Sequence, residues 1–145
     1  MDHLKVDIRL DEGVSVPAYT RDGDAAVDLV AREPLHLAPS ERGSVGTGVR
    51  IAVPKGYVAQ VLPRSGNAFK RGVTVVNAPG TIDSNYRGEI RVGLINHDAY
   101  EAFDVEPGDR VAQLLIVPAP VIDFNVVDEL DETERGEAGF GSSGR

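Results

Sequence analysis

The chain has 145 residues, of which 41% are hydrophobic and 26% charged, values typical of one soluble globular domain with a single core. It contains no cysteine, which excludes disulfide bonds and thiolate metal sites and fits a reducing, cytoplasmic compartment. The formal net charge of −8 excludes an extended basic surface for nucleic acid, so we expect no nucleic-acid partner. No signal-like or bilayer-length apolar run occurs, so we expect no membrane partner either.

Short strand-like patterns, separated by Gly and Pro, recur along the chain and predict an all-β fold of the sandwich, jelly-roll or barrel type. The predicted strands cover residues 4–9, 26–30, 35–37, 49–53, 57–62, 73–76, 89–96, 110–117 and 121–127. One short helix is predicted at 64–72, with Ser65 as its N-cap and Gly72 as its C-terminal stop. We expect a β domain over residues 1–127 and a mobile arm over residues 128–145, because the latter is acidic and then Gly/Ser-rich.

The segment 80–89 holds the strongest candidate chemistry. It joins the strand-like runs 73–76 and 90–95, a pattern that predicts a β-hairpin. An ordinary hairpin tip needs only turn residues. This one also contains a carboxylate, Asp83, and an aromatic ring, Tyr86, so it is a candidate site with a general base and a flat surface.

Weaker signals lie outside this hairpin. Arg64 and Ser65 stand at the start of the predicted helix, where anions are favoured, although a plain N-cap with a surface arginine explains this segment better when it is taken alone. Asp28 and Gln113 interrupt apolar strands, and such buried polar groups need a partner, a ligand or a metal. The Gly-rich arm offers backbone N–H groups and several side chains for phosphate, or is merely a frayed terminus; these side chains are Arg135, Ser142 and Ser143, with Phe140 as its one large apolar residue.

Two apparent motifs do not support the sites that they first suggest. Residues 139–144 fit the G-x-G-x-x-G pattern, but a dinucleotide site requires a strand before the motif and a helix after it. His3, His36 and His97 are far apart in the sequence and have no cysteine beside them, which argues against a zinc site.

Five segments, taken in order, resemble the five motifs of the trimeric dUTPase family. They are residues 26–29, 63–66, 80–89, 108–116 and 135–144, and they span nearly the whole chain. The resemblance implies a β-clip, jelly-roll-like subunit in a homotrimer whose active sites are shared between subunits. It also implies hydrolysis of dUTP to dUMP and diphosphate with Mg²⁺ as the cofactor.

The same resemblance implies roles for individual residues. Asp83 would activate the attacking water, Tyr86 would lie under the deoxyribose, and Asp28 would hold Mg²⁺ through water. Phe140 would close over the uracil when the arm orders. The remaining substrate-binding residues implied for uracil and phosphate are Arg64, Ser65, Gly66, Asn77, Gly80, Thr81, Ile82, Gln113, Arg135, Gly141, Ser142 and Ser143.

The sequence departs from the family pattern at three positions. Asn85 stands where Asp is common, and we expect it to act as a turn residue with little effect on catalysis. Ala138 replaces a glycine, which would strain the closed arm if that position requires a positive φ. Ser143 replaces the usual Thr and keeps the hydroxyl group.

Two alternatives remain open from the sequence. A dCTP deaminase shares the fold and the trimeric plan but should lack this hairpin and this tail pattern. A non-catalytic trimeric β module that binds nucleotide is the other, although Asp83, Asp28 and the phosphate-binding set argue against it.

Overall fold

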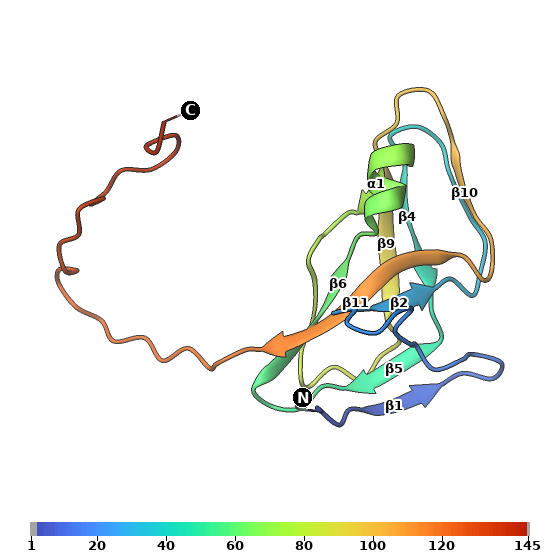
Figure 1. Ribbon diagram of the computed structural model, residues 1–145, viewed down its shortest axis with the longest axis horizontal. Helices are drawn as coiled ribbons and strands as arrows, with labels where there is room; N and C mark the ends of the chain where they lie inside the picture. Colours follow the sequence, from blue (N-terminus) through green and yellow to red (C-terminus); the bar gives the residue numbers. More distant parts are fainter. Residues whose placement is uncertain (1–2, 145) are drawn as a thin grey trace.

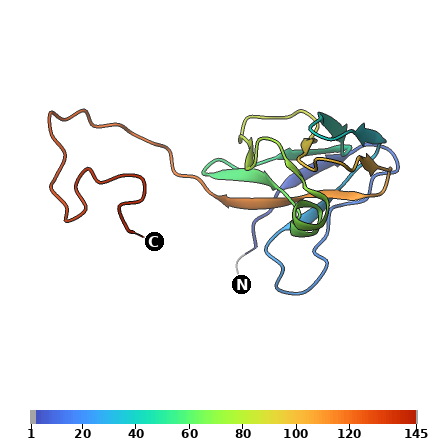
Figure 2. The same ribbon diagram turned by 90° about the horizontal axis from the view of Figure 1, so that it is seen from above.

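The computed structural model describes residues 3–144, with a compact β body and a long C-terminal extension (Figures 1 and 2). No helix in this part of the chain is both long and apolar enough to cross a membrane. The elements, in chain order, are β1 (Asp7–Leu10), β2 (Val27–Val30), β3 (Leu35–Leu37), β4 (Arg42–Gly46), β5 (Val49–Ala52), β6 (Tyr57–Leu62), α1 (Ser65–Arg71), β7 (Val73–Val75), β8 (Gly80–Ile82), β9 (Arg91–Asn96), β10 (Phe103–Val105) and β11 (Arg110–Pro118).

The strands form four antiparallel groups, of which two position the candidate sites. The largest sheet has the order β2-β11-β6-β8, and a second sheet has the order β4-β9-β7. Gln113 of β11 pairs with Asp28 of β2 on one side and with Leu62 of β6 on the other. The strands β2 and β8 are therefore the opposite edges of the largest sheet.

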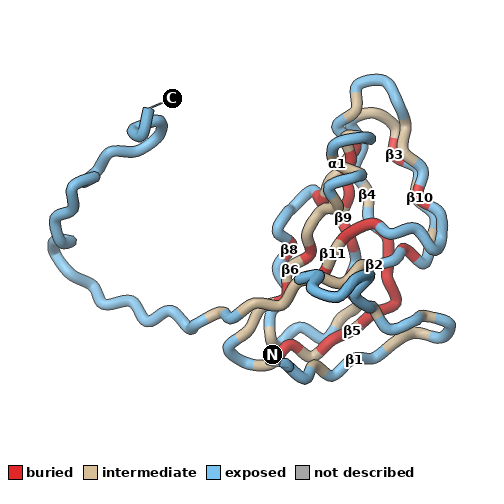
Figure 3. Tube along the Cα trace, in the orientation of Figure 1, coloured by how far each residue is buried: buried red, intermediate tan, exposed pale blue. Residues whose placement is uncertain are grey.

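One hydrophobic core connects these sheets, and it follows from the alternation of side chains along each strand. In β6, Ala59 and Val61 are buried while their neighbours are only half-buried; in β9, Val92 and Leu94 take the same role. Figure 3 shows the buried positions concentrated within the body, whereas the extension is exposed throughout. Because the core is built from alternate residues of many short strands, the polar residues between them are left for the surface and the sites.

The structure confirms the all-β class with one short helix. The predicted pairing of residues 73–76 with 90–95 is also confirmed, since Val73 pairs with Asn96 and Val75 with Leu94. The segment between them is more than a hairpin tip. Gly80–Ile82 forms its own strand, β8, and pairs with β6 of the other sheet. The sequence analysis missed β4, β8 and β10; β4 contains two glycines, and β8 lies in the segment that was expected to form the hairpin tip.

Two local predictions were wrong. Residues 121–127 form no strand in this chain, because no neighbouring strand lies within hydrogen-bonding distance of them; Val121, Phe124 and Val126 are instead exposed. The N-cap of α1 is Arg64, which makes no side-chain capping bond, and Ser65 is the first helical residue. The C-terminal stop was correct, since Gly72 adopts the left-handed φ of 68° that favours glycine.

Candidate functional site

The first candidate site is a pocket of about 240 Å³ beside β8. Its walls include the residues that the sequence analysis assigned to the base, the sugar and the water: Asn77, Gly80, Thr81, Ile82, Asp83 and Tyr86. The backbone N–H of Tyr86 donates to the carbonyl of Asp83 at 3.1 Å and closes a tight turn there. The carboxylate of Asp83 is exposed at this turn, so it is free to accept a proton from a water molecule in the pocket.

Glu89 and Arg91 line the same pocket and were not predicted as site residues. Glu89 accepts a hydrogen bond from the backbone N–H of Gly48 at 2.8 Å, and Arg91 forms an ion pair with Glu33 at 2.7 Å. The backbone N–H of Gly46, followed by the Arg91 guanidinium, lowers the pKa of the exposed Glu33 carboxyl. These contacts fix the segment after the hairpin to the β4–β5 turn. In the sequence, the available signal for Glu89 and Arg91 was their charge at the end of the hairpin segment.

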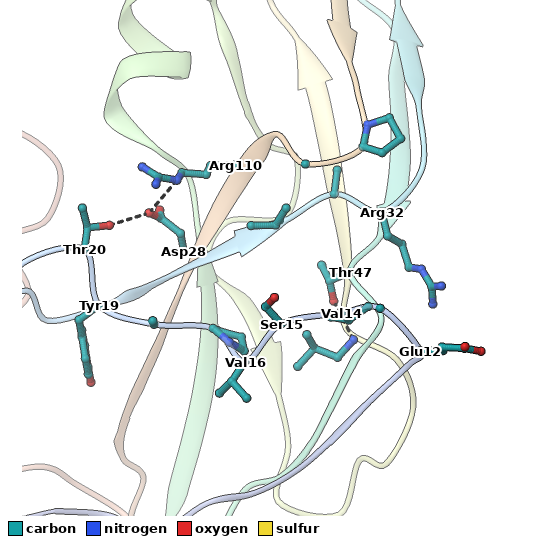
Figure 4. Close-up of a pocket in the computed structure, with 18 residues that line it drawn as sticks. Glu12, Val14, Ser15, Val16, Tyr19, Thr20, Asp28, Arg32, Thr47 and Arg110 are labelled. Carbon is teal, nitrogen blue, oxygen red and sulfur yellow. Dashed lines mark hydrogen bonds and ion pairs between the residues drawn. The ribbon is translucent and has the colours of Figure 1, made fainter.

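The second candidate site is a charged corner around Asp28, at the edge of a larger pocket of about 720 Å³ (Figure 4). Arg64 Nε lies 3.2 Å from Asp28 Oδ1, and Arg110 Nε lies 3.7 Å from Asp28 Oδ2. The hydroxyl of Thr20 donates to Asp28 Oδ2 at 3.1 Å. The corner therefore brings two guanidinium groups onto one largely buried carboxylate, whose side chain is 14% exposed.

Arg110 and Thr20 are residues that the sequence analysis missed. Arg110 begins β11 directly after a turn, and the register places it beside the end of β2. Its position in the G-D-R-V run was the available signal, but the sequence does not show that β2 and β11 are neighbours. Thr20 lies in an irregular loop, where no pattern distinguishes it.

Other predicted phosphate-binding residues surround this corner. Gln113 is half-buried on β11, directly opposite Asp28 in the strand register. Ser65 and Gly66 are exposed at the start of α1, immediately after Arg64. Asn67 of α1 donates to the carbonyl of Arg110 at 3.5 Å and so connects the helix to β11. The structure thus gathers Asp28, Arg64, Ser65, Gly66 and Gln113 into one region.

The donor set of this corner suits a magnesium ion that arrives with a polyphosphate. Within residues 3–144, no group of three or more His, Cys, Asp or Glu side chains could hold a metal ion. Asp28 is therefore a single carboxylate, and Mg²⁺ commonly keeps several waters and is bound by one or two carboxylates together with substrate phosphates. Asp28 therefore fits an ion of this kind.

The predicted substrate-binding residues of the arm form a third group, apart from the hairpin pocket and the Asp28 corner. Arg135, Phe140, Gly141, Ser142 and Ser143 line a shallow hollow within the arm's own turns. Arg135 Nε donates to the carbonyl of Ala138 at 2.9 Å, and the Phe140 side chain is fully exposed. Figures 1 and 2 show this end of the chain extended away from the body. Ala138 does not have a positive φ in this conformation, so alanine is unstrained here.

The hairpin pocket and the Asp28 corner are also separate within one chain. Asp28 lies on β2 and the hairpin segment starts with β8, the two edge strands of the largest sheet, with β11 and β6 between them. Neighbouring strands are about 4.8 Å apart, so the backbones of these two edges are separated by roughly 14 Å. Arg64 instead follows β6, the strand that pairs with β8.

Comparison with known proteins places the chain in a family. The family profile described as dUTPase matches residues 12–144. This chain belongs to the dUTPase family. A deoxyuridine 5'-triphosphate nucleotidohydrolase of Nocardia farcinica is 53% identical over 136 residues, which cover 94% of this chain and 82% of that relative. One from Leifsonia xyli is 54% identical over 129 residues, which cover 89% of this chain and 85% of the relative.

Solved dUTPase structures have the same fold as this member of the family. The Staphylococcus bacteriophage 80alpha dUTPase with dUPNHPP matches with a TM-score of 0.89 at 28% identity, covering 97% of this chain and 99% of that one. A mutant dUTPase from phage phi11 of S. aureus, described for its coordination of a structural Mg(II) ion, matches with a TM-score of 0.79 at 25% identity, covering 89% of this chain and all of that one. The predicted resemblance to dUTPases is therefore confirmed, together with the fold that it implied.

Proposed function

We propose that this protein hydrolyses dUTP to dUMP and diphosphate, and that it does so as a homotrimer whose active sites combine segments of different copies. One observation supports the proposal above the others. The hairpin pocket holds a base and an aromatic ring, whereas the Asp28 corner holds two arginines directed at one carboxylate. Each group has what the other lacks for cleaving a nucleoside triphosphate, and Asp28 and the hairpin lie on opposite edge strands, whose backbones are about 14 Å apart in one chain.

In the proposed reaction, Asp83 accepts a proton from a water molecule whose oxygen attacks the α-phosphorus. The new P–O bond forms as the bond from that phosphorus to the α,β-bridging oxygen breaks, and diphosphate leaves with the bond's electron pair. A positioned general base typically contributes about 10²–10⁴ to the rate. The exposed turn that carries Asp83 gives the water access to the carboxylate from the pocket.

The hairpin pocket suits the nucleoside half of the substrate. Asn77 and the backbone of Gly80–Ile82 offer hydrogen-bonding groups for the edge of uracil, and Tyr86 offers a ring face to a deoxyribose. A site that pairs with one base edge can reject a different edge by about 10⁴–10⁵, because the unpaired groups are then buried.

The Asp28 corner suits the triphosphate half. Arg64 and Arg110 are paired with Asp28 in the free chain, and we expect both guanidinium groups to turn to phosphate oxygens when dUTP binds. That exchange would leave the Asp28 carboxylate available to water molecules around Mg²⁺. The ion would offset charge on the triphosphate, while Ser65 and Gln113 would contact the phosphate groups near the reacting phosphorus.

The exposed apolar part of the extension supports an assembly. Ile122, Phe124 and Val126 alternate with polar residues, and their side chains are 71%, 83% and 94% exposed in the single chain. A strand-like pattern of this kind stabilises a protein only when its apolar face is buried against a neighbour. We propose that this segment packs on another copy and that the Arg135 and Phe140 end of the arm closes over a site there.

A substrate panel tests the proposed reaction. Purified protein with Mg²⁺ should release diphosphate from dUTP, little from dTTP and dCTP, and no ammonia from dCTP. Absence of diphosphate release from dUTP would overturn the activity, and ammonia from dCTP would identify a deaminase instead. Hydrodynamic mass measured on the same sample should be three times that of the chain.

A further inference from the structure

The ring of Tyr86 rests on Gly88, two residues further along the hairpin. The Tyr86 hydroxyl donates to the carbonyl of Glu89 at 2.9 Å, which holds the ring against the backbone. A Cβ atom on Gly88 would lie 2.6 Å from Cζ of this ring and 3.0 Å from Cε2, and closer still to the hydroxyl oxygen. Side-chain carbons do not approach neighbours at such distances, so only glycine leaves the ring in this place.

The backbone conformation is not what requires glycine at this position. Glycines with positive φ occur elsewhere in the chain, for example Gly72 and Gly108, but Gly88 is not among them. An L-residue would therefore fit the backbone of position 88, and the three atoms nearest to its Cβ would all belong to Tyr86. The space that the Tyr86 ring occupies, and not the backbone conformation, is therefore what requires glycine at position 88.

The backbone under the ring is anchored to the core, so a collision would move the ring and not its support. Glu89 accepts from the N–H of Gly48 at 2.8 Å, and the N–H of Ile90 donates to the carbonyl of Val49 at 2.8 Å. The carbonyl of Ile90 accepts from the hydroxyl of the buried Thr47 at 2.6 Å. Tyr86 is 45% exposed and faces the pocket, so it is the part that is free to shift.

We propose that Gly88 is a positioning residue for sugar discrimination: it seats the Tyr86 ring at the height that admits a deoxyribose and excludes a ribose. The inference rests on the proposed dUTP hydrolysis and adds to it the part that sets selectivity against UTP. A ring that rejects a hydroxyl by shape alone must be held within a fraction of an ångström, because it makes no polar contact that would correct its position. The seat formed by Gly88 and the Glu89 carbonyl provides that constraint.

The test compares Gly88→Ala in two backgrounds, with the ratio of kcat/KM for dUTP to that for UTP as the measurement. In the wild-type background this ratio should fall about ten- to a hundredfold, as expected when a contact surface moves by up to 1 Å. In a Tyr86→Ala background the same substitution should leave the ratio unchanged, because there is no ring to displace. Asn85→Ala, at an exposed neighbouring turn position, is the matched control and should keep the wild-type ratio.

Two outcomes would overturn the inference: an unchanged ratio in Gly88→Ala, or an equal fall in both backgrounds, which would show that Gly88 acts through the backbone. The double variant has room for the new methyl group, so it remains a valid comparison if Gly88→Ala alone is poorly folded. In that case, binding of non-hydrolysable dUTP and UTP analogues to the folded fraction replaces turnover as the measurement. If wild-type protein does not hydrolyse dUTP at all, the proposed function fails instead.

Discussion

Asp28 is held by groups that a triphosphate would compete for. Its carboxylate contacts Arg64, Arg110 and Thr20, all from different parts of the chain. A largely buried carboxylate is destabilised when it loses its charged partners, so Asp28 needs a replacement when the arginines turn to phosphate. Arginine makes charge-assisted and often bidentate bonds to both carboxylate and phosphate. The corner therefore suits an exchange in which phosphate takes the arginines and the water molecules around Mg²⁺ take Asp28.

Replacing Asp83 with asparagine should separate binding from chemistry. The amide keeps the size of the side chain but cannot take up the proton of the attacking water, so kcat should fall about 10²–10⁴-fold. Affinity for a non-hydrolysable dUTP analogue, measured by calorimetry, should stay close to the wild-type value. Asp7→Asn, at an exposed position in β1, is the matched control and should change neither quantity. Wild-type turnover in Asp83→Asn would contradict the assignment of the base.

Glu33 should make stability depend on pH in the acid range. The Gly46 N–H and Arg91 favour its ionised form and lower its pKa in the folded chain, so its contribution is complete above the ordinary glutamate value of 4.5. The contribution is lost as pH falls below that value and through the lowered pKa. Thermal melting followed from pH 6 to pH 3 should therefore decline less steeply in Glu33→Gln than in wild type. A Glu106→Gln variant, at an exposed position, should keep the wild-type slope; identical slopes in all three proteins would refute the prediction.

At the scale of elements, the sequence predicted where the strands lie along the chain better than which strands pair with each other. The patterns at 35–37 and 57–62 matched β3 and β6 residue for residue, because alternation and flanking turn residues are local properties. The crossing of Gly80–Ile82 to the other sheet was not predictable, because it depends on β6 offering a free edge. The same limit applies to the site: the hairpin residues were found from one continuous segment, whereas Arg110 joins the Asp28 corner only through the pairing of β11 with β2.

The arm is the element whose removal should affect activity without affecting the fold. Residues 119–144 contain no helix or strand, and Arg135 and Phe140 contact only the arm itself. Ending the chain after Glu134 should therefore leave the melting temperature within about 2 °C of the full-length value while lowering kcat/KM for dUTP at least tenfold. A Phe140→Ala variant should reproduce part of the loss. Full activity in the truncated protein would exclude a closing arm.

At the scale of the whole molecule, the proposed trimer predicts that a single chain is inactive. The hairpin pocket and the Asp28 corner lie on opposite edge strands, and the arm extends from the body beyond β11. A closed cyclic trimer gives each copy the same surroundings, so a hairpin from one copy can meet a corner from the next at three equivalent places. A pocket of about 720 Å³ lies beside Asp28 on this edge of the sheet (Figure 4).

Mixed assemblies of two inactive variants should recover activity if the sites are shared. One variant would be Asp83→Asn, with an intact corner, and the other would combine Arg64→Gln with Arg110→Gln and keep an intact hairpin. Co-expressed with different tags and purified through both, every mixed trimer contains one junction where an intact corner meets an intact hairpin. Such trimers should show about one third of the wild-type kcat, since one of three cyclic junctions is complete. Each variant purified alone sets the baseline, and mixed trimers no more active than that baseline would show that each site is built within a single chain.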